Sequence, residues 1–146
     1  MNVHPMPPGP PIRKAPPTHA QHLLRDARRL LAEAAESSHP NLRYATAHLA
    51  ALRAAAAVLA VRGPVAPARG RPRTAWVLLE QAEPLLAQWA AFFAAGAPTR
   101  AAAEAGLPGA TTPAEADDLL HSTETFLTVV EDTLHIPTQQ SLPLTG

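Results

Sequence analysis

Residues 40–62 read PNLRYATAHLAALRAAAAVLAVR, and this stretch decides the fold. Pro40 stands where proline is favoured at a helix start, and Gly63 followed by Pro64 is a strong stop signal. Apolar residues inside it recur at spacings of three and four and form a seam suited to packing on a partner helix: Leu42, Ala45, Leu49, Leu52, Ala56 and Leu59. The alanine run at 54–57 allows that partner to approach closely. A long helix from Pro40 to Gly63 is therefore expected.

Helical periodicity continues on both sides of this stretch. We expect a first helix from residue 18 or 19 to 36, and a third from Thr74 to Gly96 that Pro84 kinks or splits near Glu83. A short helix should follow over residues 98–105. The last helix should begin at the capping box Thr112-Pro113-Ala114-Glu115 and run to Pro137. No segment alternates with period two, so the sequence predicts an all-α, up-down bundle of four to five helices.

The length of 146 residues fits one domain. Residues 1–17 contain seven prolines and are expected to be a disordered tail, the helical domain should span 18–136, and residues 137–146 should be a flexible C-terminal tail. The absence of cysteine excludes disulfides, thiolate zinc sites and a cysteine nucleophile. The start of the chain lacks a signal-peptide pattern, and the uncharged run 84–99 is too short to span a bilayer. A cytoplasmic protein without membrane attachment is expected.

The net charge of zero hides a strong asymmetry. Residues 1–73 hold 11 basic and 3 acidic residues, whereas residues 74–146 hold 1 basic and 9 acidic residues. The loop expected at 63–73, GPVAPARGRPR, is basic and carries no acid, so its arginines are candidates for phosphate contacts with RNA or a nucleotide. The full candidate set is Arg53, Arg62, Arg69, Arg71 and Arg73. The alternative is a solvated linker, or a positive charge that neutralises the acidic half of this chain or of a partner.

Other chemistries find little support. The pattern HExxH is absent, as are GxSxG, GxGxxG and a phosphate-binding loop. Asp117, Asp118 and His121 share one end of the last helix, a pattern that is more typical of a solvated helix start than of a metal site. We therefore expect no metal and no cofactor. Helical spacing of the aromatic residues favours a role in the core.

The phrases RYATAHLAALRAAAAVLA at 43–60 and AWVLL at 75–79, with the loop between them, resemble the HEPN superfamily (higher eukaryotes and prokaryotes nucleotide-binding). The chain looks most like the actinobacterial SAV-type HEPN proteins, and the similarity extends over residues 20–134. This resemblance implies a four- or five-helix bundle, frequent homodimerisation and association with RNA or nucleotides. It also implies possible roles in defence, stress response or toxin systems.

Many HEPN proteins are metal-independent ribonucleases with an arginine and a histidine separated by four to six residues, and two copies of the motif meet across a dimer. Here Arg43 and His48 fit the spacing within the second helix, and Arg13 and His19 fit it in and beside the expected tail. Chance alone gives about as many matches, and in this family the motif usually lies near the start of a later helix. Five residues on one helix place two side chains about 140° apart. The alternative for His48 is a partly buried, hydrogen-bonded core histidine.

Three functions follow as hypotheses. The first is a dimeric module that associates with RNA or a nucleotide without catalysis. The second is a HEPN endoribonuclease that uses Arg43 and His48 across a homodimer. The third is a protein–protein adaptor of a stress or toxin-type system, in which the alanine-rich seam and the divided charge serve assembly.

Overall fold

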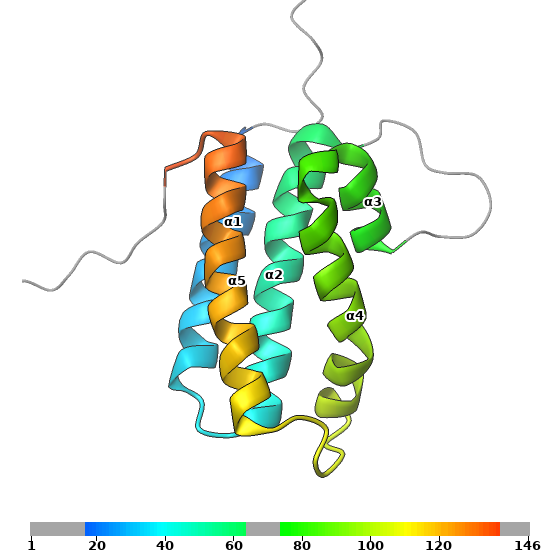
Figure 1. Ribbon diagram of the computed structural model, residues 1–146. Coiled ribbons are helices and arrows are strands. Elements are labelled where there is room, and N and C mark those ends of the chain that lie inside the picture. The colour runs from blue at the N-terminus through cyan, green and yellow to red at the C-terminus, as the bar shows by residue number, and fades with distance from the viewer. Residues whose placement is uncertain (1–16, 64–73, 138–146) are drawn as a thin grey trace, which may run out of the picture.

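Within residues 17–63 and 74–137, which the computed structural model describes, every regular element is helical. The elements are α1 (Pro17–Glu36), α2 (Pro40–Arg62), α3 (Ala75–Ala82), the 3-10 turn η1 (Pro84–Leu86), α4 (Ala87–Glu104) and α5 (Pro113–Leu134). Figure 1 shows α1, α2, α4 and α5 running alternately up and down, with α3 beside the upper part of α4. The predicted all-α bundle is confirmed. Of the expected tails and basic loop, residues 1–16, 64–73 and 138–146 lie outside the described residues.

The helix ends follow the signals in the sequence. Pro40 begins α2, and the backbone N–H of Gly63 closes it by donating to the carbonyl of Leu59. At α5 the predicted capping box is present: the Thr112 side chain accepts from the Glu115 backbone, and the Glu115 side chain accepts from the Thr112 backbone. These bonds satisfy donors that would otherwise be orphaned at the first turn.

Helix α2 is the centre of the bundle, because it packs against α1, α5, α4 and α3. Its buried face consists mainly of alanine, including Ala47, Ala51, Ala54 and Ala55, all inaccessible to solvent. The predicted seam packs within this chain only in part: Ala45 is buried and Leu49 and Leu52 pack partly buried against the core, whereas Leu42 is 58% exposed. Small residues face inward because four helices approach α2 closely, and the larger leucines remain towards its open side.

By length and composition α2 is also long and apolar enough to cross a membrane, which the run 84–99 is not. In the bundle this helix packs against four other helices and carries Arg43 and Arg53, both paired with carboxylates. A core helix satisfies the same length and composition criteria as a membrane span, so one such helix is weak evidence for a membrane span.

The two proline-containing parts of the second half behave differently. Pro84 splits the chain as predicted, since α3 ends at Ala82 and η1 begins at Pro84. The expected separate helix over residues 98–105 is wrong, because α4 runs without interruption from Ala87 to Glu104 with Pro98 inside it. Pro98 is exposed, so the carbonyl that loses its backbone donor is on the side where water can replace it.

Aromatic rings fill the space between α3, α4 and α5. Trp76, Phe93 and Phe126 are buried, and the Phe93 ring centroid lies 5.2 Å from that of Trp76 and 5.0 Å from that of Phe126. Trp89 packs partly buried against the same cluster, whereas Phe92 stays exposed. The expectation of an aromatic core holds for four of the five rings.

Gly96 marks a close approach between α4 and α2. A Cβ atom at this position would lie 2.7 Å from the Tyr44 hydroxyl. We expect Gly96→Ala to lower the free energy of unfolding by about 1 kcal/mol, although alanine is the better helix former by a similar amount. In a Tyr44→Phe background, which lacks the hydroxyl, the same substitution should raise it. Urea unfolding of the wild type, the two single variants and the double variant measures both changes in the free energy of unfolding. The same effect of Gly96→Ala in both backgrounds would contradict this explanation.

Candidate functional site

The candidate catalytic residue Arg43 closes the end of α1. Its Nε donates to the carbonyl of Ala34 at 3.1 Å, and its Nη2 donates to the carbonyls of Ala35 at 3.1 Å and Ser37 at 2.6 Å. Its Nη1 pairs with Asp117 of α5. The last carbonyls of a helix receive no hydrogen bond from within the helix and carry partial negative charge. A guanidinium, which is positively charged and donates hydrogen bonds, is therefore well suited to bind them. Arg43 therefore ties together the ends of α1, α2 and α5.

We expect Arg43→Met to lower the free energy of unfolding by about 2 kcal/mol, because it removes three bonds to carbonyls and one ion pair. Arg53→Met is the matched control. Among the described residues Arg53 has no bond to a helix-end carbonyl and forms a single, partly exposed ion pair with Asp26, so its loss should cost less than about 1 kcal/mol. Equal losses for the two variants in urea unfolding would contradict the capping role of Arg43.

The second candidate catalytic residue, His48, is fully buried inside the bundle. Its side chain is 0% exposed, and its Nε2 lies 2.8 Å from the carbonyl of Phe93 on α4. Since a carbonyl only accepts, Nε2 carries the hydrogen, and the buried Nδ1 has no hydrogen-bond partner among the described residues. The rings of Tyr44, Trp76 and Phe93 surround it. Burial lowers the pKa of His48 below 6.5, with the bond to Phe93 opposing that change.

The structure does not bring Arg43 and His48 together. Arg43 reaches α1 and α5, whereas His48 reaches α4, so the two side chains leave α2 on different sides. A histidine without solvent access has no route to a 2′-hydroxyl in this conformation. The site described for His48 is the buried, hydrogen-bonded one that we gave as the alternative. Arg13, part of the other spacing match, lies outside the described residues.

The candidate phosphate-binding residues are divided between paired and undescribed positions. The Nε of Arg53 lies 3.0 Å from Asp26. Arg62 pairs with Glu83, and its Nη2 donates to the carbonyl of Thr133 at 2.9 Å. Arg69, Arg71 and Arg73 lie outside the described residues. Arg53 and Arg62 thus hold the bundle together in this conformation and would have to leave their partners to bind phosphate.

Charge pairing across the bundle explains much of the asymmetry in the sequence. Arg28, Arg43 and Arg62 in the first half each pair with a carboxylate of the second half, namely Glu131, Asp117 and Glu83. The described residues contain seven arginines and twelve carboxylates, a net charge of −5. The remaining five basic residues lie in segments 1–16 and 64–73, which hold no acid. Within the described chain the first half carries +3 and the second half −8, so these three pairs neutralise only part of the acidic half.

The group Asp117, Asp118 and His121 does not form a cluster around one point. Asp117 turns to Arg43, and the side chains of Asp118 and His121 are exposed. Among residues 17–63 and 74–137 there is no set of three histidines or carboxylates that could hold a metal ion. The described residues thus offer no candidate metal centre.

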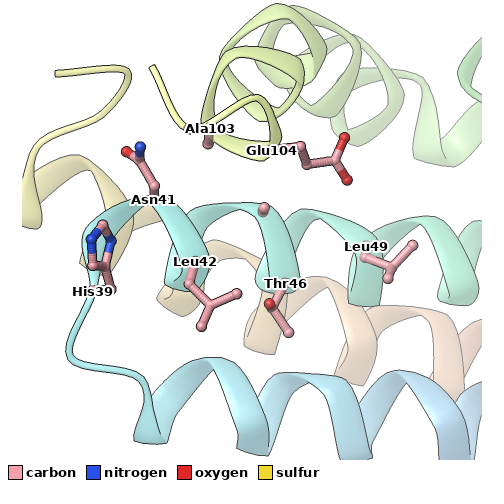
Figure 2. A pocket seen from close by; sticks show the side chains of 9 residues that line it. His39, Asn41, Leu42, Thr46, Leu49, Ala103 and Glu104 are labelled. Atoms are coloured by element: carbon pink, nitrogen blue, oxygen red, sulfur yellow. The ribbon is translucent and has the colours of Figure 1, made fainter. Parts of the chain in front are cut away.

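A pocket that the sequence did not predict opens between α2 and the end of α4. Its volume is about 630 Å³, and Figure 2 shows Leu42, Thr46 and Leu49 following one another along α2, with Ala103 and Glu104 opposite. The Asn41 side chain donates to the carbonyl of Leu107 and fixes the chain after α4 at the pocket rim. The signal in the sequence that could have revealed this pocket is the apolar seam of α2, which begins at Leu42. The structure leaves Leu42 exposed at the pocket.

The pocket belongs to a longer open line on α2. Six residues at spacings of four, three, four, three and four remain partly or fully exposed, and we refer to them as the α2 strip: Leu42, Thr46, Leu49, Arg53, Ala56 and Ala60. The strip runs between α1 and α4, because Arg53 pairs with Asp26 of α1, and Ala103 and Glu104 of α4 line the pocket at the Leu42 end. A helix that packs against four others thus keeps one continuous side partly exposed.

The architecture is that of an antiparallel helical bundle built around an alanine-rich central helix. Residues 34–131, more than half of the chain, match the family described as HEPN_SAV_6107-like HEPN. The chain therefore belongs to the HEPN family, as its sequence resemblance indicated. Comparisons with curated proteins and with solved structures gave no match.

Proposed function

We propose that this HEPN-family domain is a non-catalytic protein–protein association module that binds through the α2 strip. The observation that carries the proposal is the exposure of this strip on a helix whose other sides are packed. Leu42 is 58% exposed and Leu49 is half-buried at the edge of the pocket, an arrangement that costs solvation free energy unless a partner covers it. The spacing along the strip is the one by which helices pack on helices.

The charge distribution supports this proposal over phosphate binding. The described arginines at the predicted sites, Arg43, Arg53 and Arg62, are each held by a carboxylate. The described domain is net negative, which opposes the approach of a polyanion. A ribonuclease would need Arg43 and His48 to converge on the scissile phosphate, and neither is free to do so in this conformation.

Site-specific photocrosslinking in cells that express the protein tests the proposal. A photoreactive phenylalanine analogue in place of Leu49 should yield discrete crosslinked products with protein, because this position is on the α2 strip. The same analogue in place of Glu124, which is exposed on α5, should yield none. Absence of products at both positions, or equal products at both, would contradict an association role for the strip.

RNA association is a second candidate because the basic residues outside the described domain lack acidic neighbours in the sequence. Residues 64–73 contribute Arg69, Arg71 and Arg73 and no acid. Three arginines would give weak binding that decreases steeply with salt and does not depend on sequence. Fluorescence anisotropy with a single-stranded RNA at low and at physiological salt measures it. Loss of binding in the triple alanine variant, with no cleavage of the RNA, would support this function; no binding by the intact chain at low salt would exclude it.

A further inference from the structure

We infer that the surface between α4 and α5 is a second docking face, separate from the α2 strip, and that its partner is a basic amphipathic helix of another protein. The side of this face on η1 and α4 consists of Leu85, Trp89 and Phe92, at spacings of four and three. The side on α5 has spacings of four, three, four and three, and consists of Asp118, Ser122, Thr125, Val129 and Asp132. We refer to the two lines together as the α4–α5 face.

Ring contacts and helix geometry bring the two lines together. The Trp89 ring centroid lies 5.4 Å from that of Phe126 on α5, so these two residues mark where the helices meet. At about 100° per residue, the α5 line lies beyond Phe126 on the side away from Glu131, which faces α1. Phe92 likewise lies beyond Trp89 on the side away from the buried Ala90. Because α4 and α5 run in opposite directions, both lines reach the same outer side of the ring cluster (Figure 1).

Large apolar side chains are exposed on the α4 side of this face. Leu85 is 88% exposed and Phe92 is 45% exposed, and Trp89 packs only partly buried against the core. One exposed leucine is ordinary on a protein surface, but three large side chains in one line form an apolar patch. Aromatic residues are the commonest anchors of protein interfaces, and this spacing is the one by which a second helix packs. The patch therefore suits a helical partner with an apolar side.

The charges around the patch define the rest of the partner. Asp118 and Asp132 are exposed near the two ends of the α5 line, and neither forms an ion pair with an arginine of the described residues. Residues 74–99 and 113–134 contain no lysine or arginine, and Arg100, which lies between them, pairs with Glu104. Carboxylates without a competing base attract a basic partner and oppose nucleic acids and anionic lipids.

The dimensions of the face match one helix. From Asp118 to Asp132 the α5 line rises over about 21 Å at about 1.5 Å per residue, the length of a helix of about 14 residues. Phe126, which meets Trp89, lies near the middle of that length. Apolar side chains at the centre of the partner helix can thus cover the patch while lysine or arginine near its two ends reaches the two aspartates. A surface of this size is smaller than a standard stable interface, so we expect binding in the micromolar range.

Fluorescence anisotropy with the purified full chain tests the inference. The probe is a labelled, helix-forming peptide of about 14 residues, made of leucine and lysine with the leucines on one side. A peptide of the same length with glutamate in place of every lysine is the control. We expect the lysine peptide to bind with micromolar affinity that decreases with salt, and the glutamate peptide not to bind at the same concentrations.

Substitutions show whether the peptide binds at the α4–α5 face. Phe92→Ser should weaken binding at least about tenfold and Leu85→Ser about threefold, because aromatic anchors contribute most. The double variant Asp118→Asn, Asp132→Asn should bind more weakly and with less dependence on salt. Leu42→Ser removes a similarly exposed leucine from the α2 strip and should leave peptide binding unchanged. Circular dichroism should show the same helix content for all variants, since these side chains are exposed.

Four outcomes would overturn the inference. The first is no binding of the lysine peptide, or equal binding by the wild-type chain and both serine variants of the face. The second is weakening by Leu42→Ser alone, which would assign the peptide to the α2 strip and leave the proposed association function standing. The third is tighter peptide binding when Arg69, Arg71 and Arg73 are replaced by alanine, which would make the chain's own basic segment the occupant. The fourth is self-association of the wild-type chain that Leu85→Ser abolishes, which would make a second copy the occupant.

Discussion

Replacing Arg28 by methionine is expected to lower the free energy of unfolding by about 3 kcal/mol. Arg28 of α1 holds Glu131 of α5 through two bonds, Nη2 to Oε1 at 2.6 Å and Nε to Oε2 at 3.2 Å, and its Nη2 also donates to Thr128. The Glu131 carboxylate is 0% exposed and the Arg28 side chain is 17% exposed. Removing the guanidinium leaves a buried carboxylate without its arginine, which is far more costly than losing a surface ion pair.

A double-mutant cycle separates this effect from a simple loss of packing. Arg28→Met combined with Glu131→Met removes both charges and should recover a large part of the lost stability, since apolar residues of similar size often replace a buried ion pair at little cost. Arg29→Met is the surface control, because the Arg29 side chain is exposed and pairs only with Asp26 and Glu33 of its own helix. Urea unfolding measures the two single variants Arg28→Met and Glu131→Met, the double variant and the Arg29→Met control against the wild-type chain. A loss below about 1 kcal/mol for Arg28→Met, or no recovery in the double variant, would contradict the role assigned to the pair.

The parts of the fold that were predictable depend on local chemistry. Pro40 and Gly63 bound α2, Thr112 and Glu115 cap α5, and Pro84 separates α3 from α4, each through contacts within a few residues. The seam of α2 was not predictable in the same way. Alanine is small enough to be placed on either side of a helix, so a period of three and four in an alanine-rich helix does not identify the buried side. That choice depends on how many helices pack around α2.

The role of the candidate site residues also depends on tertiary contacts that the sequence does not show. Arginine spacing in the sequence predicted phosphate contacts, yet Arg43 caps α1 and Arg62 joins α2 to the ends of α3 and α5. Arg28 and Glu131 lie 103 residues apart in the chain, so no local sequence pattern predicts their pairing. Tertiary contacts decide whether an arginine is available to a ligand, and a sequence without them can only supply the candidates. The net charge of zero thus separates into a described bundle with a net charge of −5 and two segments outside it that carry the other five basic residues.

The burial of His48 predicts a loss of stability at mildly acidic pH. Desolvation lowers its pKa in the folded state below the unfolded value of 6.5, so the unfolded chain binds a proton more readily. The stabilising effect of the neutral histidine is complete above pH 6.5 and is lost progressively as the pH falls towards the folded pKa. The nearest charged groups act against each other, because Arg100 lowers the pKa and Glu104 raises it. The slope should approach, at most, about 1.4 kcal/mol per pH unit.

His48→Gln isolates this effect, because the Gln amide can still donate to the Phe93 carbonyl but does not titrate. Urea unfolding at intervals from pH 7.5 to 5 should give a falling free energy of unfolding for the wild-type chain and a flatter profile for the variant. This range lies above the region where Asp26 titrates, since Arg29 and Arg53 lower its pKa below 3.8. His121→Gln, an exposed position, should retain the wild-type slope. If His48→Gln also retains that slope, the acid sensitivity arises elsewhere, and the neutral, buried state of His48 is not its cause.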